Sequence, residues 1–195
     1  LGIGGGPMLL FVGRIQPLKG LDVAVRALGE LNRPDAQLIV VGGVSGVEGK
    51  PELRRVQSVV DECGVGGQVH FYDPQPHHLL STFYRAADVV LVPSRSESFG
   101  LVALEAAACG VPVVATAVGG LLSLIDHGRT GFLVPQRDAV GFARYTARLL
   151  DDPVLALSMG TAAAERAKQY SWQAAALRVR KVYSELLARD LVACN

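Results

Sequence analysis

The feature that most constrains the fold of this chain is a regular alternation of short apolar runs with longer segments of helical periodicity. Runs rich in Val, Leu and Ile predict strands at 8–13, 37–42, 68–72, 88–93, 112–117 and 131–134. Most of them lack polar alternation, which is typical of strands covered on both faces. Between them, helices are predicted at 20–31, 52–63, 77–86, 99–108 and 138–150. This order predicts a doubly wound parallel α/β sheet of about six strands with right-handed crossovers.

Size and composition narrow the class of protein. The chain has 195 residues, half of them apolar, and 19 basic residues nearly balance 18 acidic ones. A chain of this length buries about 70% of its unfolded surface without disulfides or metal, and its charge balance excludes a disordered chain and a nucleic-acid binder. Residues 106–125 are uncharged, but glycines and a proline interrupt them, so we predict no transmembrane segment. Three dispersed cysteines, Cys63, Cys109 and Cys194, indicate reduced thiols and a cytoplasmic location.

The chain divides into three parts. Residues 1–7 are glycine-rich and are expected to be the remnant of a linker, and residues 8–169 are expected to form one Rossmann-like domain. In residues 170–195, apolar residues recur at steps of three and four: Trp172, Ala176, Val179, Tyr183 and Leu186. This pattern predicts an amphipathic surface helix. The helix either caps this domain or packs on a neighbouring domain that the chain lacks.

The loop after the first strand carries two cations. Ligands of an open α/β sheet bind beyond the carboxyl ends of the strands. Gly13 ends the first strand, Arg14 follows it, and Lys19 stands just before the next helix. The helix dipole disfavours a cation at that position, so we expect an anionic ligand on which both cations converge. The alternative is that both are solvated surface charges.

The glycines after the second strand do not form a dinucleotide fingerprint. Segment 42–46, GGVSG, lacks the GxGxxG spacing and the acidic residue that would follow it. We therefore do not predict a nicotinamide site. Gly42 and Gly43 either form a tight turn or let a ligand approach the backbone.

The segment after the fourth strand predicts a helix with an open N-terminus. Ser98 is the predicted N-cap, which leaves the N–H groups of Phe99, Gly100 and Leu101 unpaired at the helix start. A helix N-terminus at the carboxyl edge of a sheet suits a phosphate group. We therefore expect a phosphate-binding site here.

Two glutamates accompany this helix. Glu105 is the only charged residue between Gly100 and Ile125, so the helix is expected to be buried on most sides. A buried carboxylate needs a partner, and a ligand diol is the simplest one. Glu97 precedes the helix in the loop. The alternatives are an exposed position for Glu105 and a surface charge for Glu97.

Several of these segments together resemble a known family. They are FVGRIQPLKG, FYRAADVVLVPSRSESFGLVALEAAACGVPVVAT and VGGLLSLIDHGRTGFLV. They are similar to the C-terminal domain of retaining GT-B glycosyltransferases, the glycogen-synthase and sucrose-synthase clan, over about residues 8–183. The most specific feature is the pair of glutamates with seven residues between them. Within the clan, GRIQPLKG and DPQPHHLLSTFYRAADV look most like the actinobacterial inositol-phosphate N-acetylglucosaminyltransferases of mycothiol biosynthesis; neighbouring mannosyl- and glucosyltransferases share most of the frame.

The resemblance implies the nucleotide-sugar-binding half of a retaining transferase, which moves GlcNAc from a UDP-sugar to a small polar acceptor, inositol phosphate. The alternatives are a mannosyl- or glucosyltransferase acting on a lipid or polysaccharide, a non-catalytic nucleotide-sugar-binding module, and a sugar-nucleotide epimerase. The implied catalytic residues are Arg14, Lys19 and Glu97. The implied donor-binding residues are Gly13, Arg14, Lys19, Gln75, Glu97, Ser98, Phe99, Gly100, Leu101, Val102 and Glu105.

The implied roles are specific. Arg14 and Lys19 would bind the diphosphate, Glu105 the ribose hydroxyls and Glu97 those of the transferred sugar. Gln75 lies in the implied base-binding loop, where the mycothiol enzymes generally read D-P-R-P, so this chain departs from their pattern there.

The resemblance implies no required cofactor and no catalytic metal. A non-catalytic Mg²⁺ on the main-chain carbonyls near Tyr84, Arg85 and Ala87 would match the inositol-phosphate enzymes. It also implies a missing N-terminal acceptor domain, without which this half binds nucleotide but transfers little sugar, and a homodimer for the full-length enzyme.

Overall fold

The structure is a computed structural model that describes residues 5–188. Within these residues, six strands form one parallel sheet in the order β3-β2-β1-β4-β5-β6. The strands are β1 (Met8–Val12), β2 (Gln37–Val41), β3 (Val69–Tyr72), β4 (Val89–Val92), β5 (Val113–Thr116) and β6 (Phe132–Val134). Each lies inside its predicted range, and the strand order is that of a Rossmann-like doubly wound fold. The predicted fold class is confirmed.

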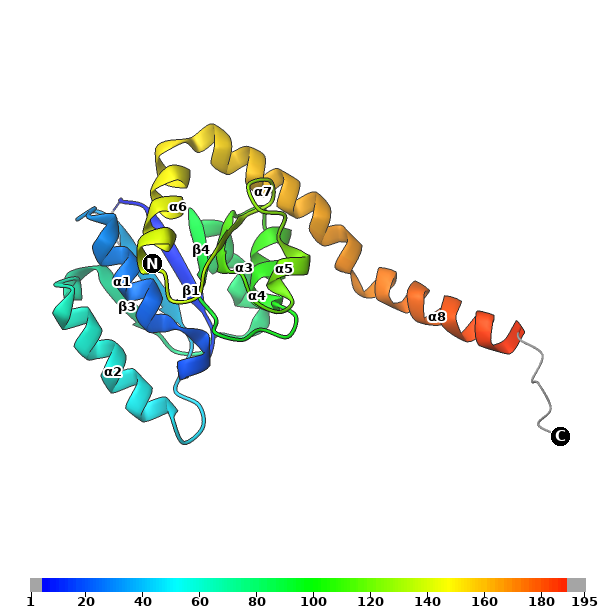
Figure 1. Cartoon of the computed structure of the whole chain (residues 1–195), viewed down its shortest axis with the longest axis horizontal. Coiled ribbons are helices and arrows are strands. Elements are labelled where there is room, and N and C mark those ends of the chain that lie inside the picture. Colours follow the sequence, from blue (N-terminus) through cyan, green and yellow to red (C-terminus); the bar gives the residue numbers. More distant parts are fainter. Residues whose placement is uncertain (1–4, 189–195) are drawn as a thin grey trace.

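Helices cover both faces of the sheet (Figure 1). They are α1 (Leu21–Leu31), α2 (Gly49–Glu62), α3 (His77–Ala86), α4 (Leu101–Ala108), α5 (Leu121–Leu124), α6 (Ala139–Asp151), α7 (Pro153–Ala167) and α8 (Trp172–Ala188). One core cluster joins the sheet to α1, α2 and α6, and another joins it to α3, α4 and α5. The single turn α5 was not predicted, and α2 begins three residues before its predicted start at Glu52.

Burial on both faces explains the unbroken apolar runs. In β1, Leu9 and Phe11 enter one core cluster, whereas Met8 and Leu10 enter the other. Successive side chains of a strand point to opposite faces, so a strand between two helical layers has no polar positions. The central strands therefore read as continuous hydrophobic segments.

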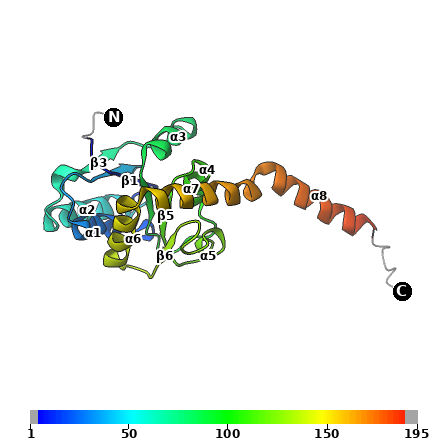
Figure 2. The ribbon, with the colours of Figure 1, turned by 90° about the horizontal axis from the view of Figure 1, so that it is seen from above.

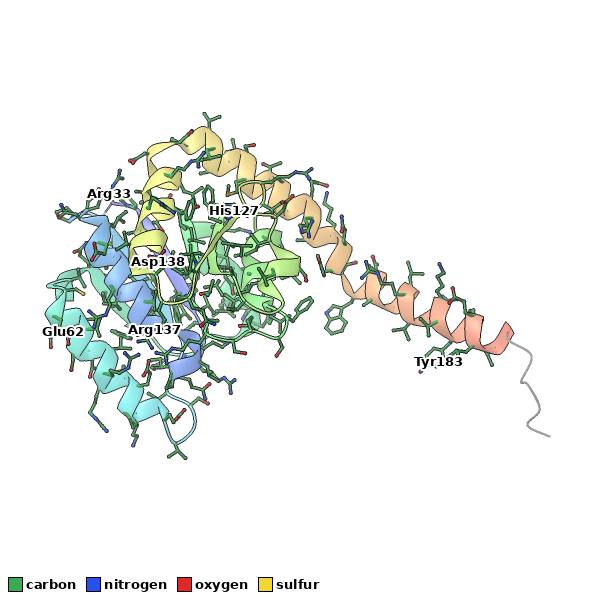
Figure 3. The ribbon with its side chains drawn as sticks, viewed as in Figure 1. Arg33, Glu62, His127, Arg137, Asp138 and Tyr183 are labelled. Atoms are coloured by element: carbon green, nitrogen blue, oxygen red, sulfur yellow. The ribbon has the colours of Figure 1, made fainter. Side chains whose placement is uncertain are left out.

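Helix α8 extends away from the domain (Figures 1 and 2). Trp172 is 91% exposed and Tyr183, on the same helix (Figure 3), is 63% exposed. The described part of α8 therefore does not cap this domain, and its packing on a further domain stays a prediction. The expected linker at 1–7 and the expected helix to residue 195 lie partly outside the described residues, and Cys194 lies wholly outside them.

Among residues 5–188, no helix combines the length and the apolar composition needed to cross a membrane. The uncharged stretch 106–125 instead contains the end of α4, strand β5 and the turn α5.

Candidate functional site at the carboxyl edge of the sheet

The strand order reverses between β1 and β4, and their carboxyl ends define the crevice where ligands bind in open α/β sheets. β1 continues into loop 13–20, and β4 continues into loop 93–100. The backbone N–H of Arg95 donates to the carbonyl of Leu18 at 2.8 Å, which joins the two loops. The sequence placed its candidate residues on these same loops.

Lys19 and Glu97 meet across this switch point. The Lys19 ammonium lies 2.8 Å from Glu97 Oε2, and the two side chains are only 24% and 16% exposed. The Ser94 hydroxyl lies 3.4 Å from the same oxygen. The anion that contacts Lys19 in this structure is the carboxylate of Glu97, and the predicted anionic ligand stays a prediction. Any anionic ligand must share Lys19 with Glu97 or displace it.

Arg14 lines a neighbouring cleft. The cleft measures about 310 Å³ and lies between the loops that follow β1, β2 and β3. Gly13, Gly42, Gly43 and Gln75 also line it. Val12 lines both this cleft and the small hollow around Lys19, so the two features adjoin. The structure thus brings Lys19 and Glu97 into contact and places Arg14 with Gln75 in the adjoining cleft.

The start of α4 differs from the prediction. Gly100, not Ser98, is the N-cap; its φ of 99° is left-handed, and no side chain caps the helix. The first intrahelical hydrogen bond runs from the Leu104 amide to the Gly100 carbonyl at 3.0 Å. The prediction of Ser98 was wrong because a glycine two residues later turns the chain into the helix.

The N-terminus of α4 nevertheless remains open toward the switch point. The amides of Leu101 and Val102 precede the first intrahelical bond and have no partner inside the helix. Val102 lines the hollow that also contains Lys19 and Glu97. Phe99 lies before the helix, and its ring packs edge-on to Tyr170 at 5.9 Å. Val102 at the start of α4 and the Lys19–Glu97 pair therefore border one hollow.

Glu105 has protein partners. The Tyr84 hydroxyl donates to Glu105 Oε2 at 2.7 Å, and His77 Nε2 lies 3.1 Å from Oε1. The Glu105 side chain is 25% exposed, and Leu101 on the same helix is 62% exposed, so α4 is less buried than predicted. The sequence predicted a ligand diol as the simplest partner of this carboxylate; α3, which packs beside α4, already supplies two partners from the protein itself.

The backbone that carries Glu97 is held by Gly119 and Gly120, a contact that the sequence analysis did not predict. The Gly120 amide donates to the Glu97 carbonyl at 2.9 Å. A Cβ on Gly119, whose φ is 47°, would lie 2.1 Å from that same oxygen. The adjacent glycines at 119–120 were the available signal, since paired glycines often mark a close backbone approach.

A buried charge cluster beside the site was also missed. The Asp22 side chain is 4% exposed, and Oδ2 accepts from Arg55 at 3.0 Å and lies 3.8 Å from Arg95. Arg137, two residues before the start of α6 (Figure 3), adds positive charge. Burial raises the pKa of Asp22, but the Arg55 hydrogen bond and the guanidinium groups of Arg55, Arg95 and Arg137 outweigh it and lower the pKa below its usual value. Arg95 precedes Glu97 in the same loop, so the cluster ties that loop to α1.

Substituting Asp22 by Asn should destabilise the chain by about 1.5 kcal/mol at pH 7, since it removes one of the two buried carboxylates that pair with Arg55, the other being Glu52. A carboxylate whose pKa is lower in the folded than in the unfolded state stabilises the folded state at pH values above its unfolded-state pKa. This contribution to the free energy of unfolding is lost as the pH falls through the folded-state pKa. The difference in Tm between wild type and Asp22→Asn should therefore be full at pH 7 and shrink below about pH 4. Thermal unfolding across this range measures it, with the exposed Asp61→Asn as control. A difference that persists unchanged at acidic pH would contradict the assignment.

The predicted Mg²⁺ site would use main-chain carbonyls and not side chains. Within residues 5–188, no three His, Cys, Asp or Glu side chains gather as ligands. The main-chain carbonyls near Tyr84, Arg85 and Ala87 lie at the end of α3, where carbonyls lack intrahelical partners. The Tyr84 carbonyl accepts from the Ala87 amide at 3.1 Å. Carbonyl oxygens suit Mg²⁺, and this site stays a prediction.

Comparison with known proteins shows which family the chain belongs to. The sequence pattern of the family described as "Glycosyl transferases group 1" matches residues 2–166. The chain belongs to this family. The predicted glycosyltransferase membership and the Rossmann-like half of a GT-B fold are thereby confirmed.

Individual relatives refine the placement. The chain is 48% identical over 180 residues to a D-inositol 3-phosphate glycosyltransferase of Corynebacterium jeikeium, covering 90% of this chain and 43% of the relative. It is 39% identical to sucrose-phosphate synthase from Thermosynechococcus elongatus, with a TM-score of 0.87 over 94% of this chain and 46% of that one. The C-terminal domain of a glycosyl transferase group 1 protein (LpcC) from Francisella tularensis is 25% identical, with a TM-score of 0.75 over 85% of this chain and 86% of that domain. The chain spans less than half the length of the first two relatives.

Proposed function

We propose that this chain is the donor-binding half of a retaining glycosyltransferase that moves GlcNAc from UDP-GlcNAc to inositol phosphate. The observation that carries the donor site is the Lys19–Glu97 pair beside the open N-terminus of α4, at the switch point of the sheet. The name of the 48% identical relative supports inositol phosphate as the acceptor. The choice of GlcNAc and of UDP rests on the resemblance in the sequence.

In the proposed complex, the diphosphate lies between Lys19 and the amides of Leu101 and Val102. Its negative charge suits both the ammonium and the helix dipole. The base enters the cleft lined by Gln75, the ribose reaches Glu105, and the sugar reaches Glu97. Once the diphosphate engages Lys19, the oxygens of Glu97 become available to sugar hydroxyls.

The proposed chemistry is charge stabilisation. The bond between the anomeric carbon and the diphosphate breaks, and its electron pair leaves with the diphosphate. Preorganised cations and amides that face this growing charge lower the barrier, and Lys19, Arg14 and the start of α4 supply them. The acceptor hydroxyl attacks from the face that the diphosphate leaves, forms the new bond to the anomeric carbon and gives its proton to the departing diphosphate, so the anomeric configuration is retained.

Thermal unfolding with UDP, GDP and ADP tests the donor site. At a concentration of about 100 times Kd, a ligand adds about 2.7 kcal/mol of stability, or roughly 8 °C in Tm for a chain of this size. UDP should give the largest shift, and uridine without phosphate should give little. A larger shift with GDP or ADP would reassign the donor base, and no shift with any nucleotide would contradict the donor site.

The second candidate is a glucosyltransferase, which the 39% identity to sucrose-phosphate synthase favours. Assays of the longer protein with UDP-GlcNAc and UDP-glucose as competing donors separate the two. Absence of transfer from either donor would leave the non-catalytic binding module. We also propose an N-terminal acceptor domain, a full-length homodimer, a cytoplasmic location and a Mg²⁺ that takes no part in the chemistry.

A further inference from the structure

The side chain of Glu105 is held from one face of α3. His77 and Tyr84 are seven positions apart, close to two helical turns, so both lie on the same face of α3. Each contacts a different oxygen of Glu105: Tyr84 bonds Oε2 at 2.7 Å, and His77 lies 3.1 Å from Oε1. The carboxylate is therefore held at both oxygens by one neighbouring helix.

The two partners differ sharply in burial. Tyr84 is 1% exposed and belongs to the core cluster on that face of the sheet, whereas the His77 side chain is 84% exposed. Burial, together with the neighbouring Glu105 carboxylate, raises the pKa of Tyr84 far above its usual value, so the phenol stays protonated. Tyr84 is thus a fixed donor, and His77 is a partner that solvent or a ligand can replace.

We propose that Tyr84 is a positioning residue that anchors Glu105 Oε2 and so presents Oε1 to the ribose hydroxyls of the nucleotide. The inference rests on the proposed function, because it assumes that Glu105 binds ribose. An ionised carboxylate only accepts hydrogen bonds, so hydroxyls of the ribose can take the place of His77 on Oε1. The buried tyrosine keeps the carboxylate from rotating out of reach when this exchange occurs.

The test is ribose discrimination by the 195-residue chain in titration calorimetry. Wild type should bind UDP at least tenfold more tightly than 2′-deoxy-UDP, since a hydrogen bond to a charged group contributes about that factor. Tyr84→Phe keeps the buried ring and removes only the hydroxyl. Tyr84→Phe should reduce the ratio of the two affinities to about threefold or less, mainly by weakening the binding of UDP.

Three further variants make the outcome decisive. Tyr170→Phe removes a tyrosine hydroxyl that faces the Ser123 carbonyl at 3.5 Å, and it should keep the wild-type discrimination. His77→Ala should keep it too, whereas Glu105→Ala should abolish it. If Glu105→Ala abolishes discrimination but Tyr84→Phe retains it, the positioning role is wrong and the ribose contact stands. If the wild type binds UDP and 2′-deoxy-UDP equally tightly, the ribose contact of Glu105 and the positioning role of Tyr84 are both wrong, but the proposed diphosphate site is not contradicted.

Discussion

Replacing Lys19 by alanine is expected to reduce kcat of the full-length transferase about a hundredfold, the cost of losing one donor that faces developing charge. The substitution also leaves the carboxylate of Glu97 without its partner at 2.8 Å, close to where the diphosphate would lie. In the 195-residue chain, the same change should weaken UDP binding by roughly tenfold or more. Initial rates and titration calorimetry measure the two effects.

The control for Lys19 is another lysine in an ion pair. Lys168 contacts Glu165 on the surface, with side chains 71% and 66% exposed. Lys168→Ala should leave both UDP affinity and turnover unchanged, because exposed pairs contribute little and Lys168 lines neither the cleft around Arg14 nor the hollow around Lys19. Equal UDP affinity in Lys19→Ala and wild type would remove Lys19 from the donor site.

Substituting Gly119 by alanine is expected to destabilise the chain by about 3 kcal/mol. The added Cβ would lie 2.1 Å from the Glu97 carbonyl oxygen, in a left-handed backbone conformation. The segment must move away, which breaks the bond from the Gly120 amide to Glu97. Thermal unfolding should show a Tm decrease of about 9 °C, and UDP binding should weaken because Glu97 and Lys19 shift.

Gly64→Ala is the matched control for Gly119→Ala. Gly64 has a φ of 67°, and nothing lies within 4 Å of its added Cβ. It therefore isolates the conformational cost of a left-handed alanine, about 1 kcal/mol. If Gly119→Ala destabilises the chain no more than Gly64→Ala, the close approach to Glu97 does not constrain this loop.

The strands could be predicted because burial of both faces of the sheet is enough to produce unbroken apolar runs in the sequence. Once Leu9 to Phe11 and Leu38 to Val41 read as unbroken apolar runs, a sheet covered on both faces follows. The turn α5 was missed because four residues give too little periodicity to register as a helix. The amphipathic sequence of α8 predicts a helix but not its direction, because the direction depends on which other residues the helix contacts.

The site was predictable in its location and less so in its contacts. The loops after β1 and β4 carry Lys19 and Glu97, and the topology brings these two residues together. The partners of Glu105 come from α3, and nothing in local spacing indicates that a histidine and a tyrosine on one helix face a glutamate on the next. The N-cap at Gly100 likewise depends on a left-handed backbone angle, whereas the sequence favoured Ser98, a residue type that commonly caps helices.

The structure of the chain with UDP bound tests the central claim most directly. The account predicts that the diphosphate lies within hydrogen-bond distance of the Lys19 ammonium and of the amides at the start of α4, with Glu97 released toward the solvent side of the crevice. A structure in which UDP binds elsewhere, with Lys19 still bonded to Glu97 and the crevice between β1 and β4 empty, would contradict it.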